Sequence, residues 1–442
     1  MSDKPSGLPP QADAAWDYPL FDAIMGRRSR RFGLGMEMVE GPFKYSSNKE
    51  PVPLDNLETA MLVAAATATT GPILAETQYP GGMVKTIGKP YPSAMGSHRA
   101  RMFFTNDDGV FVVNGDQAKM TQMREYVEAG DREKILGFYD TYVQKLDDKR
   151  LDVPSAEPGI WPHNQWVTNK PGTTIFMPVV DLTKDMIKFL LNLCDAEAGR
   201  YSGKGGGYFV VDDRNGMRPC GNQKWADSGF LSKSKVMTLS RLEQLLASGM
   251  LAEGAFMGQL QVLAMQAMGL GGWLYGGFSS LVVLGGTPMA RGLGFKFVQA
   301  KHDPFPIPVG RDGVFEGFCP PYYPSMDEAV DAALAGATMS MADWKAKGMV
   351  TPHKSGDEAF DAATVQASAN GIACVKDICR YIYDEYGKFP ATVDPMQLTL
   401  FIQSHHLDLD FYDEHMKPGA YGETHRQHFH RWHNANKPHG GE

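Results

Sequence analysis

The chain has little cysteine. Its 442 residues include five cysteines, an odd number, and none of them forms a Cys-x-x-Cys pair. Such sparse and unpaired thiols are typical of a reducing compartment and argue against a disulfide framework. The first 25 residues contain Asp3, Asp13 and Asp17 and lack an apolar run, so we expect no signal peptide. We therefore predict a cytoplasmic protein.

The chain also lacks an excess of positive charge. Lys and Arg number 43 against 51 Asp and Glu, which gives a formal net charge of −8. Because nucleic-acid binding needs a positive field over much of one face, we expect no nucleic-acid partner. The GxSxG and HExxH patterns of hydrolases are absent, so a hydrolytic function has little support.

One long stretch carries no charged residue and raises the question of a membrane span. It runs from Gly254 to Ala290, but glutamines and the run Gly269-Leu-Gly-Gly272 interrupt its apolar character. We predict three pieces instead: a helix over 255–268, a glycine-rich turn, and a buried strand over 280–284. These pieces suit the core of a soluble protein or a subunit interface. We therefore expect no membrane partner.

The remaining patterns mix helices and strands, which predicts an α+β fold. The expected strands are a hairpin over 101–113 and a strand over 174–180. The first expected helix begins within 53–57 and ends at Thr69, and helical segments follow up to about residue 146. Further helices are expected over 182–193 and 240–249, after Ser325, once or twice within 357–386, and after Asp394.

The strongest anion-binding signal is Arg27-Arg28-Ser29-Arg30-Arg31, directly after the predicted helix 18–25. Guanidinium forks bind phosphate oxygens in a planar, two-bonded geometry, and the serine hydroxyl adds a donor. The alternatives are that the arginines complement the negative end of the helix, form a solvated basic patch, or contact nucleic acid.

Three blocks, in order, resemble the FMN-dependent nitroreductase superfamily, nearest the branch with thiazoline and oxazoline dehydrogenases. Residues 23–32 are similar to its opening helix and Arg-x-Ser-x-Arg/Lys signature, and 90–96 to its Pro-Ser loop. Residues 253–272 are similar to its loop followed by a long interface helix, which ends in a Gly-Leu-Gly turn. The resemblance implies a nitroreductase-like fold, with a central mixed or antiparallel sheet flanked by helices, and a homodimer with FMN at its subunit interface.

The residues that the resemblance implies for FMN binding fall into four groups. They are the phosphate and ribityl ligands Arg27, Arg28, Ser29 and Arg31; the ring contacts from the partner subunit Pro92, Ser93, Met95 and Gly96; the backbone donors to flavin N5 at Glu253 and Gly254; and a second phosphate ligand, Arg291. The alternatives are a plain turn at Pro92-Ser93 and a helix cap at Glu253.

The implied activity is that of an FMN-dependent oxidoreductase. NAD(P)H would pass hydride to flavin N5, and the flavin would then reduce a small organic substrate in a ping-pong cycle, or would run in the dehydrogenating direction. No general acid or base is identified. Gly96, His98, Arg99 and Ala100 depart from the family's loop. This departure motivates an alternative, a binding or assembly protein that kept the fold and lost flavin turnover.

The implied organisation has three parts: 1–116 with 236–330 as the FMN-binding core, 117–235 as an insertion or lid, and 331–442 as a helical, histidine-rich extension. Eight of the 12 histidines fall in the last 38 residues. If helical, the stretches 405–410 and 424–433 place imidazoles and carboxylates at spacings that can converge on a metal, and the predicted ligands are His425, His428, His430 and His433. The alternative is a solvated or subunit-clasping helix whose histidines bond neighbouring carboxylates.

Overall fold

The computed structural model describes residues 8–73, 87–94, 96–115, 132, 134–198, 205–214, 216–335, 341–346, 354 and 366–433. Helices and strands are mixed along these residues, so the chain is α+β, as predicted. Several predicted features lie outside the described residues, among them Met95, most of the segments expected over 117–133, and the end of a helix at Gly336.

A seven-stranded sheet forms the centre of the molecule, and every strand pair in it is antiparallel. Its strand order is β12-β17-β8-β5-β6-β7, with the short strand β16 also paired to β8. The bounds are β5 Ala100–Asn106, β6 Gly109–Val113, β7 Val143–Asp147, β8 Thr174–Asp181, β12 Gly271–Tyr275, β16 Met396–Gln397 and β17 Phe401–His405. Some neighbouring strands come from distant segments, since Ser404 of β17 pairs with Thr174 of β8 and with Gly272 of β12.

Both faces of this sheet are buried. Side chains alternate along a strand, so Phe176 and Val180 of β8 join one hydrophobic core while Ile175, Met177 and Val179 join the other. All eight residues of β8 are buried. The continuous apolar run that predicted this strand is what a strand covered on both faces requires.

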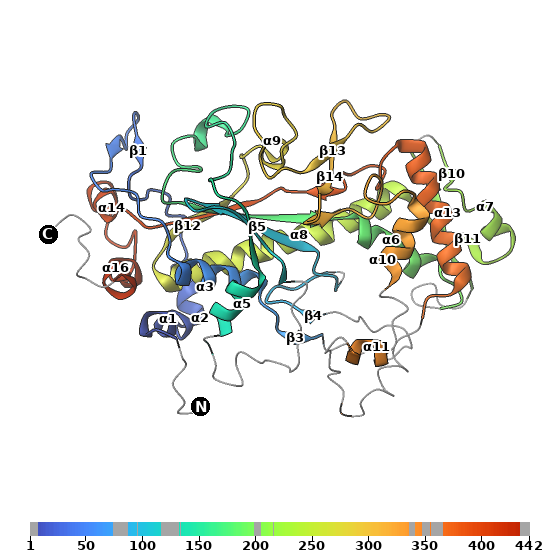
Figure 1. The fold of residues 1–442 in the computed structure, drawn as a ribbon, viewed down its shortest axis with the longest axis horizontal. Coiled ribbons are helices and arrows are strands. Elements are labelled where there is room, and N and C mark those ends of the chain that lie inside the picture. Colours follow the sequence, from blue (N-terminus) through green and yellow to red (C-terminus); the bar gives the residue numbers. More distant parts are fainter. Residues whose placement is uncertain are drawn as a thin grey trace.

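A single helix, α8 (Leu239–Met268, 30 residues), packs beneath the sheet (Figure 1). At 1.5 Å per residue it is about 45 Å long. Two separate helices were predicted here, with a stop at Gly249; that stop is wrong, because the helix continues to Gly269. A glycine such as Gly258 has a packing reason, since an added Cβ would lie 2.4 Å from Leu274 and 3.0 Å from Ile402. The missing side chain lets the helix approach the sheet closely.

Two groups of helices flank α8, one towards each end (Figure 1). The first group is α1 Pro10–Trp16, α2 Leu20–Gly26, α3 Asn56–Thr67 and α5 Lys134–Tyr142. The second is α6 Thr183–Cys194, α10 Met326–Leu334 and α13 Ala369–Tyr386, with α7 Gln223–Asp227 and the small sheet of β9 Gly207–Asp212, β10 Arg218–Pro219 and β11 Leu231–Thr238. The predicted hairpin 101–113 and helices 182–193 and 326–334 are confirmed.

The remaining elements are short. They are β1 Glu37–Met38, β2 Tyr45–Ser46, β3 Gly71–Pro72, β4 Ile87–Gly88, the 3-10 helix η2 Pro162–Asn164, α9 Ser280–Leu284, β13 Lys296–Val298, β14 Ile307–Arg311, β15 Phe315–Glu316, α11 Met341–Ala346, α14 Leu409–His415, α15 Glu423–Arg426 and α16 His428–Trp432. Helices α14 and α16 lie near the end of the molecule where α1 and α2 also lie (Figure 1).

Four sequence predictions of local structure are wrong. Residues 280–284 form a helix rather than a strand, and the expected glycine turn contains the start of β12. Residues 143–147, expected to be helical, form the edge strand β7. The segment after Asp394, also expected to be helical, forms β16 and β17, and β17 lies inside the sheet between β12 and β8.

Gly269, which ends α8, offers a test of this packing. Its φ is +83°, and an added Cβ would lie 2.2 Å from the carbonyl oxygen of Thr424. We expect Gly269→Ala to lower the free energy of unfolding by about 3 kcal/mol, the sum of left-handed strain and overlap. Gly419→Ala is the matched control, because its φ is +96° but nothing lies within 4 Å. It should cost only about 1 kcal/mol in urea denaturation, and equal losses would contradict the packing.

Candidate functional site

The arginine cluster is held by one buried member. Arg30 is 5% exposed and donates hydrogen bonds to Gln266 Oε1 of α8 at 3.0 Å and to the Ala420 carbonyl at 2.8 Å. Burial lowers the pKa of Arg30 to about 10, so the guanidinium stays charged at neutral pH. Arg30 pairs with Gly272 of β12 in an isolated bridge. The predicted ligand set omitted this residue, the one that anchors the segment.

The predicted phosphate ligands lie on either side of Arg30. Arg28, Ser29 and Arg31 are exposed, and Arg27 is half-buried at the end of α2. Arg28 donates to the carbonyls of Met25 at 3.0 Å and Arg27 at 2.8 Å, as expected for arginines that complement a helix end. The Arg31 guanidinium lies 5.6 Å from the centroid of the Trp166 ring. The donors needed for a phosphate are thus exposed next to a fixed anchor.

The predicted serine loop is tied to α8 by Glu253. The Ser93 hydroxyl donates to Glu253 Oε1 at 2.6 Å, and Glu253 Oε2 accepts from the backbone N–H of Arg99 at 2.7 Å and of Ala100 at 2.9 Å. Glu253 is fully buried, and burial raises the pKa of its carboxyl. Pro92 is exposed and Gly96 half-buried. Ser93 and Glu253, both predicted to contact the flavin, therefore form a hydrogen bond with each other.

Glu253 and Gly254 do not fit their predicted role as backbone donors to a flavin. Both are buried in the interior of α8, where backbone N–H groups bond the carbonyl four residues earlier. An added Cβ at Gly254 would lie 3.3 Å from Pro178 of β8, so this glycine is a close packing position. The prediction had placed these residues in a loop before the helix.

The predicted flavin residues do not form one site within a single chain. Gln266, which holds Arg30, is 13 residues from Glu253, about 20 Å along the helix. Arg291 forms an ion pair with Asp147 of β7, whereas Arg30 pairs with β12. These strands are the two edges of a six-strand row, about 24 Å apart. Arg291 is thus remote from the other predicted phosphate ligands.

A different set of side chains does converge. Glu58, His406, His428 and His433 each point one ligand atom to a common centre, and these atoms all lie within 4.8 Å of one another. Glu58 Oε1 lies 3.0 Å from His406 Nε2, 2.8 Å from His428 Nε2 and 3.1 Å from His433 Nε2. We call these four residues the His3Glu cluster. It was missed as a set by the sequence analysis.

Three separate elements build the His3Glu cluster. Glu58 lies in the first turn of α3, where its second oxygen accepts from the backbone N–H of Asp55 at 2.7 Å in a capping box. His406 follows β17 directly, and His428 and His433 begin and cap α16. The Asp-x-x-Glu spacing in the sequence could have identified the capping box, but not its histidine partners.

The electrostatics of the His3Glu cluster favour an ionised Glu58. Burial raises the pKa of Glu58, but the charge of His406 and the close approach of the three imidazoles lower it more, to well below its usual range. Burial lowers the pKa of His406, but the Glu58 charge outweighs it and raises that pKa. Burial outweighs Glu58 at His428 and lowers its pKa. A buried negative charge therefore faces three imidazoles.

Two of the four histidines predicted as metal ligands lie in this cluster. His428 and His433 belong to the cluster, whereas His425 and His430 do not. His425 is buried and accepts from the backbone N–H of Gly422 at 3.2 Å, and burial lowers its pKa to about 3. His430 is exposed on the outer side of α16. Helical spacing alone did not tell which imidazoles face inward.

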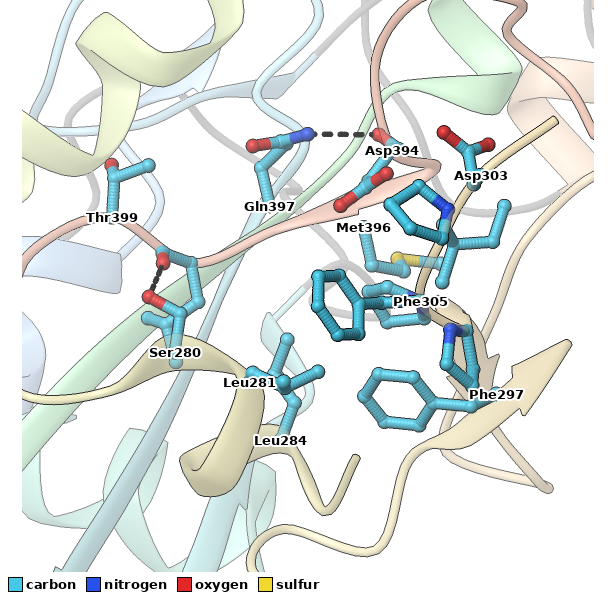
Figure 2. A pocket seen from close by; sticks show the side chains of 15 residues that line it. Ser280, Leu281, Leu284, Phe297, Asp303, Phe305, Asp394, Met396, Gln397 and Thr399 are labelled. Atoms are coloured by element: carbon cyan, nitrogen blue, oxygen red, sulfur yellow. Dashed lines mark hydrogen bonds between the residues drawn. The ribbon is translucent and has the colours of Figure 1, made fainter. Parts of the chain in front are cut away.

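Apart from these residues, a cavity of about 430 Å³ lies among α9, β13, β14 and β16. Figure 2 shows Phe297, Phe305 and Leu281 close together, with the carboxyl groups of Asp303 and Asp394 to one side. Asp303 pairs with Lys388 at 2.6 Å, and burial raises the pKa of Asp394. None of the predicted flavin or metal residues lines this cavity.

Comparisons with known proteins assign no family. No protein-family model and no curated protein matches the chain. It is similar to a solved structure from Ralstonia eutropha JMP134 that bears a provisional nitroreductase name, at 12% identity and a TM-score of 0.27. The match covers 64% of this chain and 77% of that one. A score this low establishes no common fold. Among the described helices, none combines the length and apolar character needed to cross a bilayer.

The pairing of Glu253 with the serine loop leads to a stability prediction. Glu253→Ala leaves the N–H groups of Arg99 and Ala100 without their acceptor, so we expect the free energy of unfolding to fall by about 2–4 kcal/mol. Glu253→Gln keeps one acceptor for both N–H groups and a donor for Ser93, and should cost about 1 kcal/mol. Urea denaturation measures both, and an alanine variant as stable as the glutamine variant would contradict this account.

Proposed function

We propose that this protein is an oxidoreductase that binds FMN through the arginine cluster. The observation that carries the proposal is the buried Arg30, which fixes the segment against α8 while its neighbours Arg28, Ser29 and Arg31 stay exposed. Exposed donors on a fixed backbone suit a phosphate, because less conformational entropy is lost on binding. Two of the three blocks of the family resemblance contact α8 through Arg30 and Ser93, and the third forms the end of that helix.

The residues fit the two ends of FMN unequally. Around the phosphate, guanidinium groups and a hydroxyl form a chemically suitable donor set. Among the residues predicted to contact the ring, the side chains of Ser93 and Glu253 form a hydrogen bond with each other. The exposed Pro92 and the backbone near Gly96 then remain as groups that could contact the ring. Because the two ends lie about 20 Å apart along α8, the proposed site takes its ring contacts from a second subunit.

The surface of α2 supports a homodimer. Leu20, Phe21 and Met25 are 62%, 72% and 71% exposed, directly before the arginine cluster. Large apolar side chains grouped on one short helix are characteristic of an interaction surface. A second copy that covered α2 would lie next to the arginine cluster.

When bound, FMN supplies hydride chemistry between NAD(P)H and a small organic substrate. The chain would supply charge for the phosphate, orientation and exclusion of water. A second candidate is a binding or assembly protein without flavin turnover. The observation that favours it is the closed Ser93–Glu253 pair, which leaves no free carboxylate or hydroxyl facing a ring.

The phosphate assignment is tested by Arg27→Ala and Arg31→Ala. Each lost fork–phosphate contact should weaken FMN binding by about 1.5–3 kcal/mol, roughly 10- to 150-fold, measured by quenching of flavin fluorescence. Arg291→Ala is the control and should bind FMN normally, because Arg291 lies at the opposite sheet edge. A wild-type protein that binds FMN and bleaches anaerobically with NADH or NADPH supports the enzyme. One that refuses FMN supports the second candidate.

The subunit arrangement has its own test. We expect Phe21→Glu and Met25→Glu to convert a dimer into a monomer, because each places a charge in a desolvated interface. Light scattering coupled to size-exclusion chromatography measures the mass. Met289→Glu is the control, since Met289 is 58% exposed but not on α2. A wild-type monomer, or a dimer that survives both α2 variants, would contradict the proposed interface.

A further inference from the structure

We propose that the His3Glu cluster is a metal site that holds one Zn²⁺-like divalent transition ion. Three imidazole nitrogens and one carboxylate oxygen form the donor set, which suits zinc and related first-row metals rather than calcium or magnesium. The site is separate from the proposed flavin site, and none of the predicted flavin residues belongs to it.

Four of the six separations between the ligand atoms lie near the value for tetrahedral coordination, and all six are within 4.8 Å. Zinc bonds of about 2.0–2.1 Å place the four ligand atoms of a tetrahedron about 3.3–3.4 Å apart. Nε2 of His433 and Nε2 of His406 are 3.3 Å apart. The three distances from Glu58 Oε1 to the imidazoles are 2.8, 3.0 and 3.1 Å. Small outward movements of the side chains would therefore complete the tetrahedron.

Hydrogen bonds on the far side of two rings orient their lone pairs inward. His406 Nδ1 lies 2.9 Å from the Val52 carbonyl and His428 Nδ1 lies 2.8 Å from the Met268 carbonyl. A carbonyl oxygen only accepts, so each Nδ1 carries the proton and, in the neutral ring, Nε2 is a bare lone pair. Metal-binding histidines are typically fixed in this way.

One buried polar atom of the His3Glu cluster is unsatisfied without a cation. His428 is 2% exposed, and its Nε2 faces Glu58 at 2.8 Å yet has no hydrogen-bond partner among the described residues. A bare lone pair at this nitrogen repels the carboxylate in a site of low dielectric constant, whereas Nε2 of His406 and of His433 lie within hydrogen-bond distance of Glu58 Oε1. A divalent cation at the centre would give all four ligand atoms a bond.

The surroundings indicate a closed, structural centre. Glu58 is fully buried, the side chain of His406 is fully buried, and the side chain of His433 is 14% exposed. Four protein ligands fill a tetrahedron and leave no position for a substrate, unlike three-ligand catalytic zinc sites. The ion would join α16 to α3 and to the end of β17, and so fix the C-terminal segment on the core.

The site is tested on the full-length, flavin-free protein after treatment with a chelator, so the result does not depend on flavin binding. Added Co²⁺ should give the intense visible absorption of tetrahedral coordination and saturate at about one ion per chain. Glu58→Gln and His433→Ala should each lower Co²⁺ affinity at least about tenfold. His430→Ala is the matched control, because His430 is exposed in the same helix, and it should bind Co²⁺ as the wild type does.

A second measurement covers variants that fold poorly. In the wild type, Zn²⁺ should raise the melting temperature and slow tryptic cleavage after Arg426 and Arg431, both exposed on α15 and α16. Neither effect should occur with Glu58→Gln. The proposal is overturned if saturating Co²⁺ gives no tetrahedral absorption with the wild type, or if His430→Ala loses binding as Glu58→Gln does. The cluster would then be a hydrogen-bonded network of imidazolium and carboxylate groups.

Discussion

The buried polar side chains of α8 are the interactions on which the arrangement of distant segments depends. Glu243 accepts from the backbone N–H of Ala391 at 2.8 Å, Glu253 holds the serine loop, and Gln266 receives Arg30. Each of these groups lies in an apolar core, where an unpaired partner costs about 1–3 kcal/mol. The three segments are therefore positioned relative to one another through a single helix.

The antiparallel sheet sets the second constraint. Strand β17 fits between β12 and β8, so the C-terminal region completes the core rather than covering it. Because residues alternate in a strand, His405 packs towards Trp273 while His406 points towards α3. Insertion of this one strand brings His406 to Glu58. The proposed metal centre is thus a consequence of strand order, and the arginine cluster is linked to the same edge through β12.

Local patterns predicted the fold well where they were long and periodic. Helix α3, the hairpin of β5 and β6, and strand β8 with helix α6 follow directly from spacing and capping signals. They failed at Gly249, which the continuous helix tolerates within α8, and at 280–284, where a short apolar run fits a strand or a helix equally well. Of the four cluster residues, His406, His428 and His433 lie in the two stretches that the sequence singled out, and Glu58 does not.

Residue types and spacing were enough to establish an α+β chain and to single out a basic segment and a histidine-rich region. They could not establish which arginine is buried, since Arg30 differs from its neighbours only in the contacts that α8 makes with it. Nor could they bring together His406 and Glu58, which are 348 positions apart. Contacts of that separation depend on how strands and helices pack, and local propensity carries no information about them.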